Sequence, residues 1–189
     1  MSIKSVPDLL CYARLLLVPV VLALALLNLP FYAGIALLAA GLTDVLDGTL
    51  ARGWNIATAY GSRLDSIADT LMEVSAAAAV LILKPGIFTG HALILGAWIA
   101  FEASSILLGW IKFRRIANLH LYLTKAAGVI AYAFVIYTLV IGYNEAFFYA
   151  AAALLIVSSL ECLVLQLSAP RVDEHMKSIY HAYRAGRLF

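Results

Sequence analysis

Six long apolar segments take up most of this chain and constrain its fold more than any other feature. Each has about 20 residues, the length that a helix needs to cross the hydrocarbon core of a bilayer. The segments cover residues 7–29, 31–51, 59–83, 88–112, 119–141 and 145–167. Several short connections carry helix-breaking residues, namely Pro30, Lys84-Pro85-Gly86 and Gly142-Tyr143-Asn144. The pattern predicts an all-α polytopic membrane protein with six transmembrane helices.

The composition agrees with this class. Hydrophobic residues make up 64% of the chain and charged residues 13%, with a mean hydropathy of +0.95. A soluble domain has about 45–50% apolar and about 25% charged residues. The formal net charge of +2 is too small to suggest a nucleic-acid partner. We expect one membrane domain over residues 1–189.

The distribution of basic residues predicts the orientation. With six spans, one face of the membrane receives Lys4, Arg52, Arg63, Lys112, Arg114, Arg115 and the basic tail with Arg171, Lys177, Arg184 and Arg187. The opposite face receives Lys84. The positive-inside rule then places both termini in the cytoplasm. The polar, basic segment from Pro170 is expected to form a short amphipathic surface helix.

Four aspartates interrupt the apolar pattern between residues 44 and 69. Asp44 and Asp47 are three residues apart and Asp65 and Asp69 four apart, so each pair lies on one helix face. A charge deep in a membrane helix costs about 2.5–3.5 kcal/mol on insertion scales, and four carboxylates also repel one another. Divalent cations, Mg²⁺ or Mn²⁺, would relieve both costs, and two of them would clamp phosphoryl oxygens. The alternative is a set of solvated charges at helix ends.

The residues between the two pairs favour a phosphate ligand. Gly48 and Gly61 remove side chains where a ligand could approach the backbone, and Ala51 keeps the Asp47 face small. Arg52 supplies a guanidinium, whose geometry suits phosphate. Together they predict a pyrophosphate site at the membrane surface.

At this point the chain resembles a known family. The pattern Asp44-x-x-Asp47-Gly48-x-x-Ala51-Arg52, eight residues, Gly61-x-x-x-Asp65-x-x-x-Asp69 matches every position in the signature of the CDP-alcohol phosphotransferases, also called CDP-alcohol phosphatidyltransferases. The opening Val6-Pro7-Asp8-Leu9-Leu10, with Arg14 and Pro19, resembles the first helix of that family. The six-helix layout agrees as well, so the resemblance extends over most of the chain.

The resemblance implies a homodimeric phospholipid-biosynthetic enzyme of a bacterial or archaeal cell membrane, with its site facing the cytoplasm. Such enzymes move a phosphatidyl or related group from a CDP-diacylglycerol-type lipid to an alcohol and release CMP. Carried onto this sequence, two divalent ions are held by Asp44, Asp47, Asp65 and Asp69. Asp69 is also the catalytic base. The donor nucleotide and its diphosphate are bound by Asp44, Gly48, Ala51, Arg52, Gly61 and Asp65.

The acceptor is less well specified. Lys125 stands where the family places a lysine for an anionic acceptor group, and Arg114 and Arg115 precede it; the alternative for all three is membrane anchoring. Glycerol 3-phosphate, inositol phosphate, serine and phosphatidylglycerol all remain open. Relatives that make phosphatidylglycerophosphate often carry an Arg-Glu pair in the fourth helix, where this chain has Phe101-Glu102. Relatives that make cardiolipin often carry the same pair, so the difference weighs against both glycerol 3-phosphate and phosphatidylglycerol without excluding either.

Two other functions use similar residues. An intramembrane prenyltransferase also binds metal–diphosphate through two aspartate-rich motifs, but it needs more helices and a further aspartate where this chain has Gly48 and Ala51. A divalent-cation transporter could use the carboxylates, yet it would not require Gly48, Arg52 and Gly61 at these spacings.

Overall fold

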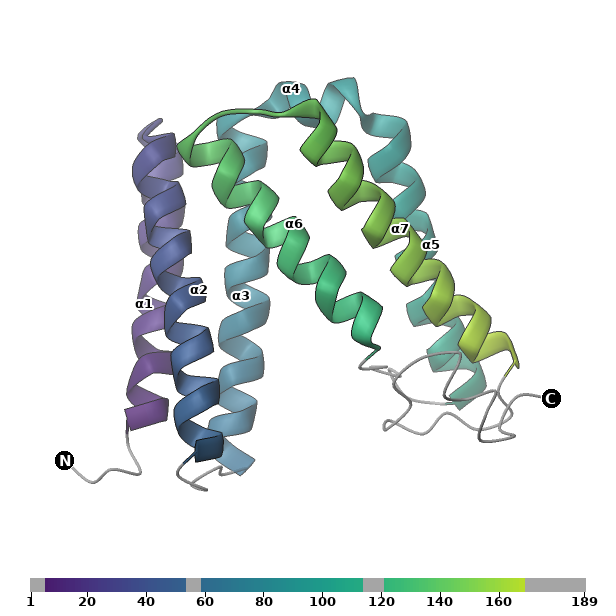
Figure 1. Ribbon diagram of the computed structural model, residues 1–189, viewed down its shortest axis with the longest axis horizontal. Coiled ribbons are helices and arrows are strands. Elements are labelled where there is room, and N and C mark those ends of the chain that lie inside the picture. Colours follow the sequence, from purple (N-terminus) through teal and green to yellow (C-terminus); the bar gives the residue numbers. More distant parts are fainter. Residues whose placement is uncertain (1–5, 54–58, 114–120, 169–189) are drawn as a thin grey trace. The chain divides into compact units, whose positions relative to one another are not determined.

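The structure is a computed structural model that describes residues 6–53, 59–113 and 121–168, with side chains described for 9–46, 60–61, 63–112 and 121–168. Seven helices lie within these ranges (Figure 1). They are α1 (Val6–Leu26), α2 (Pro30–Gly53), α3 (Ala59–Leu83), α4 (Pro85–Gly90), α5 (Ala92–Phe113), α6 (Tyr122–Val140) and α7 (Glu145–Ser168). The predicted all-α class is confirmed for this part of the chain. The tail from Pro170, expected to be a surface helix, lies outside the described residues.

Five of the helices are long and apolar enough to cross a bilayer. The qualifying stretches are Leu9–Leu26, Arg63–Leu83, Ala92–Lys112, Tyr122–Val140 and Glu145–Ser168. The sixth expected span falls on α2, whose apolar part, Pro30–Leu46, is shorter. On this helix the side chains that the structure describes end at Leu46, so the stretch covers that portion of α2 alone.

The connection between α1 and α2 is specified by two residues. Asn28 has a φ of 57°, the left-handed conformation that commonly ends a helix and that asparagine tolerates better than most residues. Its amide donates to the Ala25 carbonyl at 3.0 Å. Pro30 then begins α2, where its fixed φ suits the first helical position and its missing N–H costs nothing.

The remaining predicted breakers also lie at helix boundaries. Pro85 begins α4, a six-residue helix, so the expected span over residues 88–112 is divided between the end of α4 and α5. Gly142, with a φ of 138°, follows α6. Asn144 precedes α7, and its side-chain oxygen accepts a hydrogen bond of 2.9 Å from the Phe147 amide, which caps the helix.

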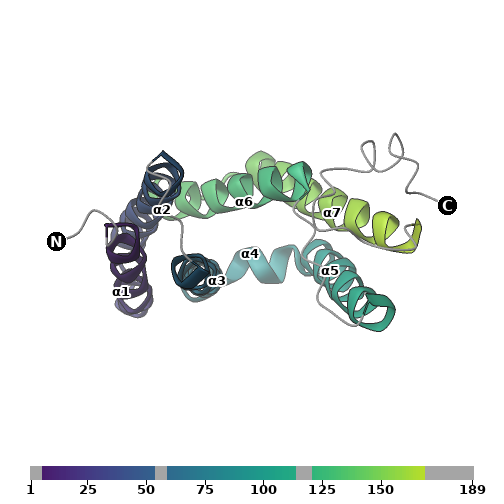
Figure 2. The same cartoon turned by 90° about the horizontal axis from the view of Figure 1, so that it is seen from below.

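The described residues form two compact units. The first comprises α1, α2, α3 and the end of α6 from Val135. In it α1 packs extensively against both α2 and α3, which contact each other much less; the three helices run alongside one another in Figures 1 and 2. Small residues dominate the buried faces, including Ala33 and Ala40 on α2 and Ala68 and Ala79 on α3. Small side chains let helix backbones approach closely, as is typical of membrane bundles.

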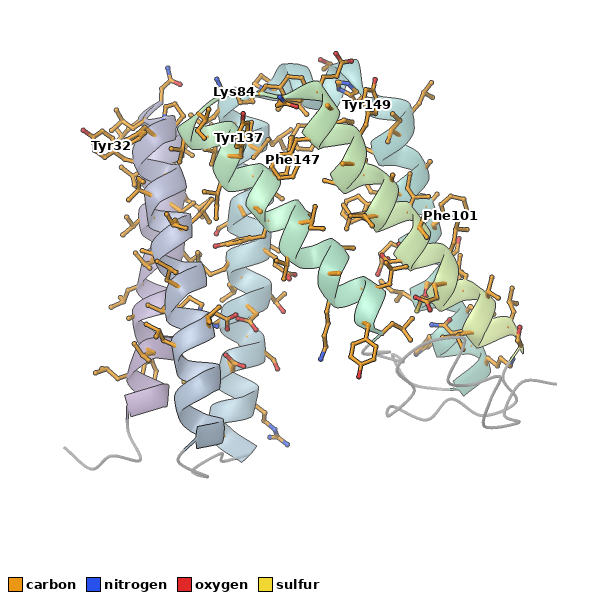
Figure 3. The ribbon with its side chains drawn as sticks, viewed as in Figure 1. Tyr32, Lys84, Phe101, Tyr137, Phe147 and Tyr149 are labelled. Carbon is orange, nitrogen blue, oxygen red and sulfur yellow. The ribbon has the colours of Figure 1, made fainter. Side chains whose placement is uncertain are left out.

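In the second unit α5 packs against α7. An aromatic group lies near the start of α7, where the rings of Phe147 and Phe148 meet the Phe134 ring with centroids 5.5 and 5.8 Å away (Figure 3). In both units many large apolar side chains are exposed, among them Leu16 and Leu93. Such surfaces suit a lipid environment, because hydrocarbon tails are as apolar as the side chains.

Candidate functional site

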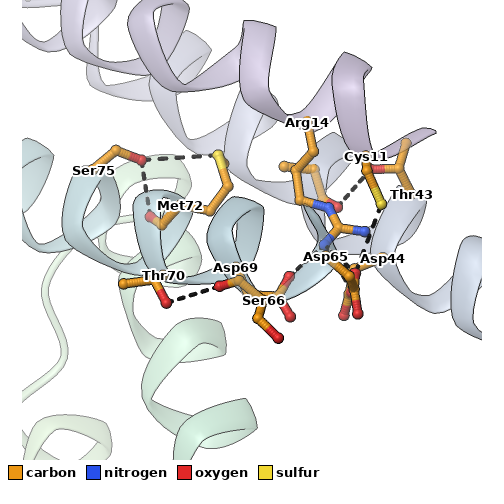
Figure 4. Close-up of polar contacts among 11 residues, drawn as sticks. Cys11, Arg14, Thr43, Asp44, Asp65, Ser66, Asp69, Thr70, Met72 and Ser75 are labelled. Atoms are coloured by element: carbon orange, nitrogen blue, oxygen red, sulfur yellow. Dashed lines mark hydrogen bonds and ion pairs between the residues drawn. The ribbon is translucent and has the colours of Figure 1, made fainter. Parts of the chain in front are cut away.

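The predicted aspartates of the first unit meet around one arginine. Asp44 comes from α2, Asp65 and Asp69 come from α3, and Arg14 reaches them from α1 (Figure 4). Arg14 Nη1 lies 3.0 Å from Asp44 Oδ1 and 3.2 Å from Asp65 Oδ1, and it also donates to Asp69 Oδ1. A single guanidinium nitrogen therefore contacts carboxylates from two other helices.

Helix geometry accounts for part of this arrangement. Asp65 and Asp69 are separated by one turn, so their side chains leave α3 on the same face, as predicted. Asp44 reaches them because α1 packs against both α2 and α3. The two acidic segments thus converge as expected, but mainly through the helix that precedes them.

Burial differs sharply between the arginine and the aspartates. The Arg14 side chain is 2% exposed, whereas the side chains of Asp44, Asp65 and Asp69 are 47%, 42% and 45% exposed. The guanidinium therefore lies on the inner side of the cluster, and the carboxylates keep an accessible side.

These three carboxylates are suited to a divalent cation. Each offers an oxygen, and the three oxygens lie within 4.8 Å of one another. Carboxylate oxygens are the hard ligands that Mg²⁺ and Mn²⁺ prefer. The Arg14 guanidinium already lies against the same carboxylates, so any bound cation would share them with it.

Other predicted site residues are placed less completely. The backbone of Asp47, Gly48, Ala51 and Arg52 belongs to the last turns of α2, while their side chains lie outside those that the structure describes. Gly61 is half-buried near the start of α3. Lys125 is exposed in the first turn of α6 and belongs to the second unit. Arg114 and Arg115 lie outside the described residues.

Sequence reasoning missed the place of Arg14 in this site. It treated Arg14 as part of the first-helix pattern and not as a partner of the aspartates. A signal was available, because a charged residue inside an apolar segment is a functional candidate by default. Near it, Tyr12 of α1 and Tyr60 of α3 form a hydrogen bond of 2.8 Å between their hydroxyls, which adds a second link between these helices.

A separate polar group joins α5 to α7 in the second unit. Ser159 donates a hydrogen bond of 2.7 Å to Glu102 Oε2, and Gln166 donates one of 3.2 Å to Ser105. Lys112 Nζ donates to the carbonyls of Gln166 and Leu167 at 2.6 and 3.0 Å. It thus caps the end of α7, whose last carbonyls accept no hydrogen bond from within the helix.

The chain matches a known protein family over most of its length. The sequence model of CDP-alcohol phosphatidyltransferases matches residues 4–158, a range that includes α1, α2 and α3 with all four aspartates.

Three similar proteins are each named CDP-diacylglycerol–glycerol-3-phosphate 3-phosphatidyltransferase. The protein of Haemophilus influenzae is 39% identical over 83 residues, which are 42% of this chain and 44% of that protein. That of Wigglesworthia glossinidia brevipalpis is 40% identical over 73 residues, 37% and 40% of the two chains. That of Escherichia coli K12 is 38% identical over 71 residues, 36% and 39%.

The matched stretch spans about two fifths of the length of each of these curated relatives. Their names give glycerol 3-phosphate as the acceptor of those relatives. The match over residues 4–158, together with the converging aspartates, settles the broader question: this chain belongs to the CDP-alcohol phosphatidyltransferase family of membrane enzymes.

Proposed function

We propose that this protein transfers the phosphatidyl group of CDP-diacylglycerol to the hydroxyl of glycerol 3-phosphate and releases CMP. The observation that carries the proposal is the convergence of Asp44, Asp65 and Asp69 within 4.8 Å in a chain that belongs to this family. The choice of glycerol 3-phosphate rests on the names of the similar proteins. Inositol phosphate, serine and phosphatidylglycerol are the competing acceptors.

Two divalent cations, Mg²⁺ or Mn²⁺, would be held by Asp44, Asp47, Asp65 and Asp69. The exposed sides of Asp44, Asp65 and Asp69 support this assignment, because an ion and a diphosphate need access to the same oxygens. When bound, the ions would supply positive charge to the diphosphate and to the departing CMP.

The residues of the chain divide the remaining work. Gly48, Ala51 and Gly61 leave room for the cytidine, and Arg52 binds the diphosphate through its guanidinium. Asp69 accepts the proton of the acceptor hydroxyl. The resulting oxygen attacks the phosphorus that carries the diacylglycerol, and the bond from this phosphorus to the oxygen of the CMP phosphate breaks, so that CMP leaves with that electron pair.

The acceptor carries a phosphate and needs a cation. Lys125 is exposed at the start of α6, where its ammonium group is accessible to a soluble anion. We assign Lys125 to this role, with Arg114 and Arg115 as further candidates.

The membrane arrangement follows from the same reasoning. Five helices have the length and hydropathy of spans, and we infer that α2 is the sixth. The basic residues then place both termini and the site in the cytoplasm of a bacterial or archaeal cell. A lipid donor can reach this site from the bilayer while glycerol 3-phosphate arrives from solution. A homodimer is the proposed assembly.

The test is CMP release by the purified protein with CDP-diacylglycerol and Mg²⁺ or Mn²⁺ against a panel of acceptors. The panel holds glycerol 3-phosphate, inositol 1-phosphate, serine and phosphatidylglycerol. Asp69→Asn tests the site in the same assay. Glu145→Gln is its control, because Glu145 is an exposed carboxylate at the start of α7. Turnover with glycerol 3-phosphate alone supports the proposal; turnover with another acceptor corrects the substrate and keeps the reaction class.

A further inference from the structure

We propose that Arg14 is a positioning residue that acts as the internal counter-cation of the aspartate cluster (Asp44, Asp65 and Asp69) and competes with divalent ions for the same carboxylates. The inference rests on the metal-binding part of the proposed function. It concerns a residue of α1, outside the signature motif of residues 44–69.

One nitrogen of Arg14 contacts one oxygen from each of the three aspartates. The oxygen that each aspartate turns toward Arg14 is Oδ1, and all three meet the same nitrogen, Nη1. Oxygens gathered within 4.8 Å around one point are also the arrangement that would hold a small cation. The guanidinium therefore occupies the inner side of the place where an ion would bind.

The positive charge of Arg14 partly balances the aspartate cluster. Arginine keeps its proton at any pH relevant to a cell, so its charge is permanent. One guanidinium among three carboxylates leaves two formal negative charges for divalent cations to balance. Arg14 thus lowers the repulsion within the aspartate cluster when no ion is bound, and it repels an ion that enters.

Arg14 is buried and contacts two neighbouring helices. Arg14 is 1% exposed, and its contacts connect α1 to residues 51 and 55 positions later on α3, as well as to Asp44 on α2. Without an ion, these contacts link all three helices. With an ion bound, the carboxylates gain a second cation, and the contribution of Arg14 to holding them together falls.

A thermodynamic consequence follows, because the coupling between two cations that share the same carboxylates is reciprocal. Arg14 weakens the binding of a divalent ion, and a bound ion reduces the contribution of Arg14 to stability by the same free energy. Replacing Arg14 by a neutral residue should lower the thermal midpoint of the ion-free protein by about 5 °C, since it removes the cation that three half-exposed carboxylates share. It should also tighten divalent-ion binding by about tenfold, since a positive charge beside the ligands of the ion is removed. Saturating Mn²⁺ should therefore recover much of the lost stability.

The experiment measures Mn²⁺ binding to the purified full-length protein by the electron paramagnetic resonance signal of the free ion, and thermal unfolding in EDTA and in saturating Mn²⁺. The variants are Arg14→Gln and Arg14→Lys, with Lys84→Gln as a matched loss of one positive charge. Lys84 follows the last residue of α3, about 22 Å along the helix axis from Asp69 at 1.5 Å per residue. The control should leave both the Mn²⁺ affinity and the Mn²⁺-induced shift unchanged.

The expected result is tighter Mn²⁺ binding in Arg14→Gln with a lower midpoint in EDTA and a larger Mn²⁺-induced shift. Mn²⁺ binding in Arg14→Gln that is equal to or weaker than that of the wild type overturns the inference. The proposed metal site still stands in that case, provided that the wild type binds Mn²⁺. Absence of Mn²⁺ binding in the wild type overturns both. Arg14→Lys keeps the positive charge, so its Mn²⁺ affinity should stay close to that of the wild type. If Arg14→Gln does not fold, wild-type-like binding by Arg14→Lys supports the inference, and binding about tenfold tighter despite the retained charge overturns it.

Discussion

Asp44 on α2 and Asp65 on α3 face the same nitrogen atom, at 3.0 and 3.2 Å from Arg14 Nη1. Residues that are 21 positions apart in the sequence thus form one group of carboxylates together with Asp69. They should consequently behave as a single metal-binding unit and not as separate charges.

The first prediction concerns metal removal. EDTA should abolish CMP release and added Mg²⁺ or Mn²⁺ should restore it. Asp44→Asn and Asp65→Asn should each raise the Mg²⁺ concentration needed for half-maximal activity by at least about tenfold, because even residues that only support metal ligands cost 10–100-fold in affinity. Combining the two should cost less than the product of the single effects, since one site is lost. Full activity in EDTA would contradict the metal assignment.

The second prediction concerns the base. Asp69→Asn should lower kcat by about 10²–10⁴-fold, the usual contribution of a positioned general base, while the protein still binds CDP. Titration of the nucleotide by calorimetry and single-turnover kinetics would separate binding from chemistry. Activity within a factor of three of wild type would remove Asp69 from this role.

The third prediction concerns the acceptor. Lys125→Gln should raise KM for glycerol 3-phosphate by about tenfold or more and leave KM for CDP-diacylglycerol unchanged, because a charge-assisted hydrogen bond to phosphate contributes about 1.5–3 kcal/mol. Lys84→Gln is the matched control on a lysine that lies beyond the opposite end of α3 from Asp65 (Figure 3). Similar effects in both variants would point to a general loss of membrane anchoring.

The fourth prediction concerns packing within the first unit. A Cβ on Gly34 of α2 would lie 2.6 Å from Val140 Cγ2 and 3.1 Å from Leu139 Cβ, on the last residues of α6. A Cβ on Gly96 of α5 would meet nothing within 4 Å. Both substitutions to alanine raise helix propensity equally, so Gly34→Ala should be less stable than Gly96→Ala by about 1–3 kcal/mol of overpacking. Unfolding in detergent compares them, and equal midpoints would argue against this close approach.

The fifth prediction concerns the contact between α5 and α7. Ser159→Ala removes a 2.7 Å hydrogen bond to Glu102 and should destabilise the protein by about 0.6 to 1.7 kcal/mol, the measured range for interhelical bonds in membranes. Ser104→Ala is the control, because Ser104 is exposed and donates to the Ala100 carbonyl of its own helix. A double-mutant cycle of Ser159→Ala with Glu102→Gln gives the coupling directly. Zero coupling would show that the contact does not contribute.

Local patterns were enough to predict much of the fold. Segment length and hydropathy predicted the five long apolar helices correctly, and Pro30 and Asn144 lie at helix starts as their chemistry requires. The short helix α4 was not predicted, because Lys84-Pro85-Gly86 reads as a connection and residues 88–112 read as one apolar run. The described side chains of α2 end at Leu46, so the sixth span stays a prediction.

The site could be predicted only in part, for a related reason. Spacing along one helix placed Asp65 and Asp69 on one face, and the structure agrees. Spacing cannot reveal that Arg14, more than 50 residues earlier, contacts both. Such contacts depend on how α1 packs between its neighbours, which the alternation of apolar residues does not encode.

The most direct test of the central claim is the simultaneous measurement of CMP and of glycerol phosphate incorporated into lipid, using purified protein, CDP-diacylglycerol, Mg²⁺ and labelled glycerol 3-phosphate. The account predicts that the two products appear in equal amounts and that both disappear in Asp69→Asn. The account would be contradicted if CMP were released and no labelled lipid formed. It would also be contradicted if wild type and Asp69→Asn formed the products equally.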